Sequence, residues 1–127
     1  MNKEDIINVL KRYNFDKNKY MVISGAAMVL LGIKESTNDI DISIKEDYYD
    51  LLLKDFNCTF ERINEHNKKV YYIDKIINFS ASYYSKKHLL LNDIPVQIPK
   101  EILELKLYLN REKDKKDIEL IKEFMNE

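Results

Sequence analysis

The stretch from Met21 to Ile44 constrains the fold of this 127-residue chain more than any other. It predicts a buried strand over 20–23, a turn of small residues at 24–25, and a short helix over 26–31. A polar loop leads to a second strand over 39–44, in which isoleucines alternate with polar residues. That alternation is typical of a strand with one buried face. The second strand is therefore expected to turn its polar face toward the small-residue turn.

That polar face carries two carboxylates, Asp39 and Asp41. Residues two apart on a strand project to the same side, and carboxylates so close repel unless a cation or hydrogen bonds hold them. A hard divalent cation such as Mg²⁺ takes oxygen ligands and leaves positions for substrate phosphates. Asp is depleted in strands, so the pattern favours a metal site. The alternative interpretation is that both side chains only face solvent.

The turn at Ser24 and Gly25 is expected to hold a nucleotide phosphate. Without a Cβ atom, Gly25 can adopt a positive φ and let a phosphate approach the backbone. The free N–H groups of the helix that follows favour an anion, and Gly32 is placed to end that helix. Together with a metal at Asp39 and Asp41, such a site would promote displacement at phosphorus by positioning and charge neutralisation.

Four later segments are predicted to be strands because apolar residues alternate or cluster between polar turns. They cover 58–63, 70–73, 76–81 and 93–97. The last is expected at an edge of the sheet, because Pro95 and Pro99 bound it and cannot donate to a ladder. The segment 83–92 is predicted to be irregular.

Apolar residues at helical spacing predict the helices. They cover 3–13, 46–54, a segment that starts at Pro99, and a final helix with Asp114 and Asp117 at its start. The two aspartates have the spacing of a capping box. Both Leu51 and Leu52 are expected to be buried, and Ile118, Ile121 and Phe124 are expected to form the buried face of the final helix. The element order predicts an α+β fold, a small mixed β-sheet with helices packed on one side. It forms one domain over 1–127, with a core at about 20–98 and a C-terminal helix pair at about 99–126.

The composition excludes several classes of protein. With 34% charged and 45% hydrophobic residues and a net charge of -1, the chain is expected to be globular and soluble, without overall attraction to nucleic acid or a membrane. No apolar run has transmembrane length, and the charged N-terminus has no signal-peptide pattern. A single cysteine, Cys58, excludes an internal disulfide and indicates a reducing compartment, for which we expect the cytoplasm.

The run SGAAMVLLGIKESTNDIDISI, residues 24–44, resembles the signature of the DNA polymerase β-like nucleotidyltransferase superfamily. That family has a Gly-Gly or Gly-Ser turn after the first core strand, a helix, and an Asp-x-Asp on the next strand. The presence of a threonine, Thr37, before the acidic pair resembles the pattern in bacterial minimal nucleotidyltransferases and in toxin-type members of abortive-infection systems. Lys106 on a helix, followed by Arg-x-Lys-Asp-x-x-Asp over 111–117, resembles their C-terminal motif. In scattered motifs, the resemblance spans roughly residues 20–125.

The resemblance implies a nucleotidyltransferase-like core that binds a nucleoside triphosphate with Mg²⁺ or Mn²⁺. It makes Asp39 and Asp41 the catalytic residues and metal ligands. The residues that it assigns to nucleotide binding are Ser24, Gly25, Thr37 and Lys106. For Lys106 the alternative is a surface lysine that keeps its charged end in water.

One departure from the family pattern concerns a third carboxylate. Active members place it on a later strand beside the acidic pair, and the corresponding strand here is 76–81. Its polar face offers Asn78, which can supply a metal with a carbonyl oxygen but cannot act as a base. Asp74, in the preceding turn, would substitute only in another register.

Three hypotheses follow. The chain is an enzyme that transfers a nucleoside monophosphate to a hydroxyl of a small molecule, an RNA end or a protein, in a toxin–antitoxin or antibiotic-modifying role. Alternatively, it is a catalytically impaired relative that binds a nucleotide or a partner. The third is a generic α+β domain with accidental acidic residues. The chain is short for the superfamily, so an acceptor site is expected to need either a second subunit, in an oligomer or with a partner, or the segment 83–92.

Overall fold

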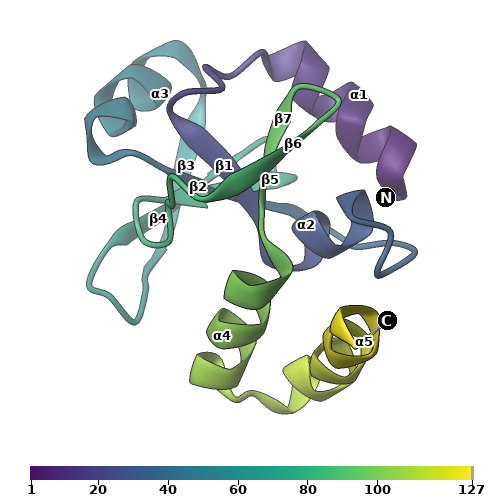
Figure 1. Ribbon diagram of the computed structural model, residues 1–127. Helices are drawn as coiled ribbons and strands as arrows, with labels where there is room; N and C mark the ends of the chain where they lie inside the picture. The colour runs from purple at the N-terminus through teal and green to yellow at the C-terminus, as the bar shows by residue number, and fades with distance from the viewer. Residues whose placement is uncertain (127) are drawn as a thin grey trace.

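The computed structural model describes residues 1–126, which form a seven-stranded mixed sheet with helices on one side (Figure 1). The sheet is open, with the strand order β3-β4-β5-β2-β1-β7-β6. Its strands are β1 (Tyr20–Ile23), β2 (Ile40–Ile44), β3 (Cys58–Ile63), β4 (Lys69–Ile73), β5 (Ile77–Ser80), β6 (His88–Leu91) and β7 (Ile94–Gln97). The predicted fold class, a mixed sheet covered by helices on one side, is confirmed.

Five α-helices and two short 3₁₀ turns complete the described part of the chain. They are α1 (Lys3–Tyr13), α2 (Ser24–Leu30), η1 (Glu46–Tyr48), α3 (Tyr49–Asp55), α4 (Pro99–Leu109), η2 (Glu112–Asp114) and α5 (Lys115–Met125). The α4–α5 pair extends away from the sheet, and α2 lies between the sheet and this pair (Figure 1). None of the helices in residues 1–126 has the length and apolar character needed to cross a membrane.

Strand pairing brings β2 to the centre of the sheet. It pairs antiparallel with β1 and parallel with β5, with Asp41 opposite Asn78 and Ile42 opposite Phe79. The alternation predicted for β2 is confirmed, because Ile40, Ile42 and Ile44 are all buried in the core. The other face of β2 is therefore the one that carries its polar side chains.

The first helix follows directly from local sequence. Asn2 and Asp5 form a reciprocal capping box at the start of α1. Ile6, Val9 and Leu10 lie on one side of the helix and are buried. This amphipathic helix packs on the core and ends at the predicted residue, Tyr13.

The C-terminal strands differ from the prediction. Residues 88–91, which were expected to be irregular, form β6, and β7 is an inner strand between β1 and β6 instead of an edge. Pro95 lies opposite Leu90 in that inner position, although it has no N–H to donate. The error arises because a proline excludes a single ladder bond, whereas the leucine-rich β6 supplies a partner along the whole of β7.

The helix faces also differ from the prediction at two positions. Leu52 is buried, but Leu51 is 48% exposed, because α3 is a short surface helix that turns a narrow face to the core. On α5, Ile121 is fully buried, whereas Phe124, which was expected on the buried face, is 40% exposed. Phe124 lies in the last turn of that helix.

Candidate functional site

All seven residues predicted to form the site line one cavity of about 610 Å³. They are Ser24, Gly25, Thr37, Asp39, Asp41, Asn78 and Lys106. The cavity lies where β1 passes into α2, where the loop before β2 meets β5, and where α4 turns into α5. Its lining is predominantly polar, so its geometry suits a charged ligand. The roles of these residues stay predictions.

The acidic pair sits at the start of β2. Asp39 immediately precedes the strand and Asp41 is its second residue, and both side chains are partly buried. Asn78 faces Asp41 from β5 in the parallel register. The expected strand thus lies beside the acidic pair, and its residue at this point is an amide.

The environment of Asp41 raises its pKa from 3.8 to about 6. Burial is the largest cause, and the negative charge of Asp39 adds to it. A hydrogen bond from Asn78 and the positive charges of Lys106 and Arg62 act in the opposite direction. Because ionisation of Asp41 is this unfavourable, a bound cation would stabilise its charged form more than that of an ordinary carboxylate.

The donor set fits a hard divalent cation. Asp39 and Asp41 offer carboxylate oxygens, and Asn78 offers an amide oxygen, which are ligands that Mg²⁺ and Mn²⁺ accept. Within residues 1–126, no group of three or more His, Cys, Asp and Glu side chains is placed to hold a metal. Any metal here would therefore depend on water or substrate oxygens for its remaining ligands.

The turn between β1 and α2 differs in detail from the prediction. The positive φ belongs to Ser24, at 57°, and not to Gly25, which lies inside the first turn of α2. The Ser24 N–H donates to the Oε1 atom of buried Gln97 at 3.0 Å. One of the backbone donors expected to meet an anion is therefore already occupied, while no described side chain caps this helix terminus.

Gly25 is required for a different reason. A Cβ atom on this residue would lie 3.1 Å from the Oγ1 atom of Thr37. The absence of a side chain thus lets the loop before β2 pack directly against the start of α2. The Thr37 N–H also donates to the carbonyl oxygen of Met1 at 3.0 Å, which fixes the loop from its other side.

Lys106 lies at the centre of a buried ion-pair network. Its Nζ atom is 3.3 Å from Asp114 and 3.2 Å from Asp117, and the residue is only 4% exposed. Arg111 binds Asp114 at 2.7 Å, and Lys34 binds Asp117 at 3.2 Å. The surface-lysine alternative for Lys106 is therefore wrong.

The network also replaces the predicted capping box. Asp114 makes no side-chain cap to α5; its carboxylate accepts hydrogen bonds from Arg111 and Lys106. Although burial raises it, these two cations hold the pKa of Asp114 below its usual range. The prediction of a capping box by Asp114 and Asp117 is therefore wrong, because Asp114 pairs with Arg111 three residues before it and with Lys106 on α4.

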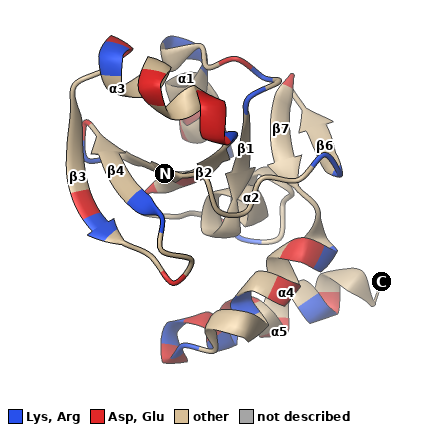
Figure 2. Ribbon diagram, turned by 90° about the vertical axis from the view of Figure 1, so that its left-hand side faces the viewer, with Lys and Arg blue, Asp and Glu red and all other residues tan. Residues whose placement is uncertain are grey.

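Sequence reasoning missed several charged residues that line the same cavity. They are Lys34, Glu61 and Arg62; Lys113 also lines the cavity and belongs to the motif at 111–117, where it was given no role. Arg62 reaches the cavity from β3, which is distant in sequence from the acidic pair, and Lys34 reaches it from the loop between α2 and β2. Figure 2 shows basic and acidic residues interleaved along α4 and α5 and side by side on β3. A basic residue on a strand face was the only available signal for Arg62.

No family model, curated protein or solved structure matches the chain. Membership of the nucleotidyltransferase superfamily therefore stays a prediction from the motifs at 24–44 and 106–117. The class of site is defined by geometry alone. It is a polar cavity in which two carboxylates and an amide lie beside several cationic side chains.

Proposed function

We propose that the protein transfers a nucleoside monophosphate from a nucleoside triphosphate to a hydroxyl acceptor, using Mg²⁺ or Mn²⁺. The observation that carries this proposal is that Asp39 and Asp41 share a cavity with cations of four separate segments. Those cations are Lys34, Arg62, Lys106, Arg111 and Lys113. Carboxylates suit the metal and cations suit the phosphates, so the two sets together fit a metal–triphosphate.

The reaction would be a displacement at the α-phosphorus. The acceptor oxygen forms a bond to phosphorus, the bond to the bridging oxygen breaks, and pyrophosphate leaves with that oxygen. When bound, the divalent ion would supply charge neutralisation and orientation at the phosphates. Asp39, Asp41 and Asn78 would hold it. The hydroxyl proton passes to Asp41 or to water, because Asn78 cannot accept one.

The cations are not equally available for phosphate. Lys34, Lys106 and Arg111 already bind Asp117 and Asp114, and Arg62 pairs with the neighbouring Glu61 at 2.8 Å. Among the described residues, Lys113 makes no ion pair. We therefore assign Lys113 to direct phosphate contact, and the Lys106 network to holding α4 and α5 at the cavity.

A second candidate function is favoured by the residue opposite Asp41. Asn78 lies opposite Asp41 in the strand register and carries no charge, so a third acid is absent from this position. A protein with this site would bind a metal–nucleotide or a partner without turnover. The resemblance leaves the acceptor open as a small molecule, an RNA end or a protein, and a toxin–antitoxin role in the cytoplasm stays a prediction.

The test is transfer of label from each of the four α-labelled nucleoside triphosphates with Mg²⁺ or Mn²⁺. Acceptors would include total tRNA, the protein itself and hydroxyl-bearing small molecules. Transfer that is lost in Asp39→Ala/Asp41→Ala but kept in Asp50→Ala supports the enzyme; Asp50 is an exposed aspartate on α3. Metal-dependent triphosphate binding without transfer supports the second function. A protein that shows no triphosphate binding and no transfer would contradict both functions.

A further inference from the structure

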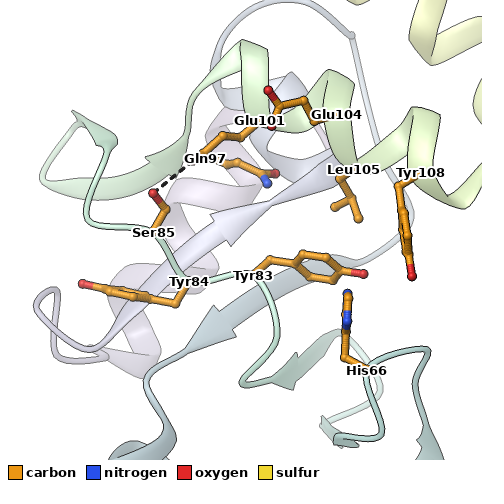
Figure 3. A pocket seen from close by; sticks show the side chains of 9 residues that line it. All are labelled: His66, Tyr83, Tyr84, Ser85, Gln97, Glu101, Glu104, Leu105 and Tyr108. Atoms are coloured by element: carbon orange, nitrogen blue, oxygen red, sulfur yellow. Dashed lines mark hydrogen bonds between the residues drawn. The ribbon is translucent and has the colours of Figure 1, made fainter.

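A second cavity, of about 420 Å³, has a different chemistry from the first (Figure 3). One wall is a single face of α4, where Glu101, Glu104 and Tyr108 recur at helical spacing. The opposite wall is the segment after β5, which contributes Tyr83 and Ser85. Its volume lies in the range of small-molecule sites.

Aromatic rings close one end of this cavity. His66, from the turn between β3 and β4, stacks on Tyr108 with ring centroids 5.8 Å apart and an interplanar angle of 10°. It also meets the Tyr83 ring edge-on at 5.0 Å. Figure 3 shows these three side chains gathered at one end, away from Ser85 and Glu101. The rings offer both an apolar surface and a cation-binding face.

Carboxylates lie at the other end. The Oε1 atom of Glu101 accepts a hydrogen bond from Ser85 at 3.1 Å, whereas its Oε2 atom is buried and has no partner among the described residues. Glu104 adds a second carboxylate to the lining, and neither Lys nor Arg is among the described residues that line this cavity. A buried carboxylate oxygen without a donor is costly, so this end favours a ligand that donates a hydrogen bond and carries positive charge.

The two cavities adjoin each other. A smaller hollow of about 100 Å³ shares Tyr83 and Leu105 with this cavity, and Asp41 and Asn78 with the polar one. The first cavity is lined by both basic and acidic side chains, whereas the second has carboxylates and no Lys or Arg among the described residues, so the second lacks the cations that a phosphate needs. The second cavity therefore cannot be explained as an extension of a phosphate site.

We propose that this cavity is a binding site for a small organic cation, an amine with an aromatic or apolar body. Its ammonium group donates to Glu101 and Glu104, and its body packs against Tyr83 and Tyr108. The inference does not rest on nucleotidyl transfer, because it uses none of the acidic-pair residues. It holds equally for an enzyme and for a binding protein.

The probe is benzylamine, and its uncharged counterpart of similar shape is benzyl alcohol. Each would be titrated into the full chain labelled with ¹⁵N, and the amide shifts followed by NMR. We expect saturable shifts at millimolar benzylamine that are confined to α4, the segment after β5 and the β3–β4 turn. Benzyl alcohol should bind about tenfold more weakly, because a charge-assisted hydrogen bond is roughly twice as strong as a neutral one.

The matched variants are Glu101→Gln, which keeps the acceptor for Ser85, and Glu123→Gln, at an exposed glutamate on α5. Glu101→Gln should weaken benzylamine binding about tenfold and leave benzyl alcohol unchanged, whereas Glu123→Gln should change neither. The variant spectra show directly whether each chain is folded. Equal binding of the two probes, shifts outside the cavity, or no saturable benzylamine binding would each overturn the proposal.

Discussion

Asp41 of β2 and Asn78 of β5 lie directly opposite each other in a parallel strand pair. The position beside the acidic pair is thereby fixed by backbone register, and it carries an amide where a third carboxylate would complete a charged triad. The pKa of Asp41, raised to about 6 mainly by burial, shows how unfavourable its charge is without a cation. This single pairing is what separates the two proposed functions.

The substitution Asn78→Asp should make the stability of the folded protein depend on a bound metal ion. A third carboxylate beside Asp41 adds like-charge repulsion, so at neutral pH and without metal we expect a loss of about 1–2 kcal/mol in the free energy of unfolding. Mn²⁺ should restore it, because binding to the folded state alone stabilises that state. Urea unfolding in EDTA and in Mn²⁺ would measure both effects. Asn126→Asp, at an exposed position on the C-terminal side of α5, serves as the control, and an Asn78→Asp protein indifferent to Mn²⁺ would contradict the metal site.

The pKa of Asp41 predicts a pH dependence of stability in metal-free buffer. Its folded-state pKa, about 6, lies above the ordinary 3.8, so the folded state holds the proton more tightly than the unfolded state. This contribution is fully present below about pH 4 and is lost as pH rises through about 6. It amounts to at most about 3 kcal/mol for a shift of roughly two units.

Asp41→Asn is the comparison that isolates this effect. The variant cannot ionise, so its stability relative to wild type should increase between about pH 4 and pH 7 in EDTA. Urea unfolding of both proteins across this range gives the difference directly. A constant difference would mean that Asp41 ionises with its ordinary pKa.

Lys106→Met should be strongly destabilising. It leaves the buried carboxylates of Asp114 and Asp117 with only their other partners, and we expect a loss of roughly 3 kcal/mol. Lys100→Met, at an exposed lysine on the same helix, should change stability by no more than about 0.5 kcal/mol. Chemical denaturation compares the two. Similar small effects in both variants would show that the network contributes little.

Gly25→Ala tests the close approach of the loop before β2. The added Cβ atom would lie 3.1 Å from Thr37 Oγ1, so we expect a loss of about 1 kcal/mol in the wild-type background. In Thr37→Ala the contact is gone, and the higher helix propensity of alanine should make the same change neutral or stabilising by up to about 1 kcal/mol. A double-mutant cycle of unfolding free energies gives the coupling. Additive effects would contradict the contact.

Much of this fold was readable from the sequence. Asn2 and Asp5 cap α1 locally, and the alternating isoleucines of β2 decide which face is buried. Each of these signals comes from residues that are close together in the sequence, where the periods of helix and strand fix the geometry. The sequence was misleading at Pro95, because the bonds of β7 depend on β6 and not on its own residues.

The features of the site also fall into those that the sequence determines and those that depend on the tertiary structure. The sequence alone determined the acidic pair at the start of β2, the small residues after β1, and the amide at Asn78. Only the tertiary structure decided that Lys106 is buried between Asp114 and Asp117, that Ser24 and not Gly25 has the positive φ, and that Arg62 enters the cavity. Periodicity is a property of neighbouring residues, whereas ion pairs, close approaches and cavities depend on segments that meet only after folding.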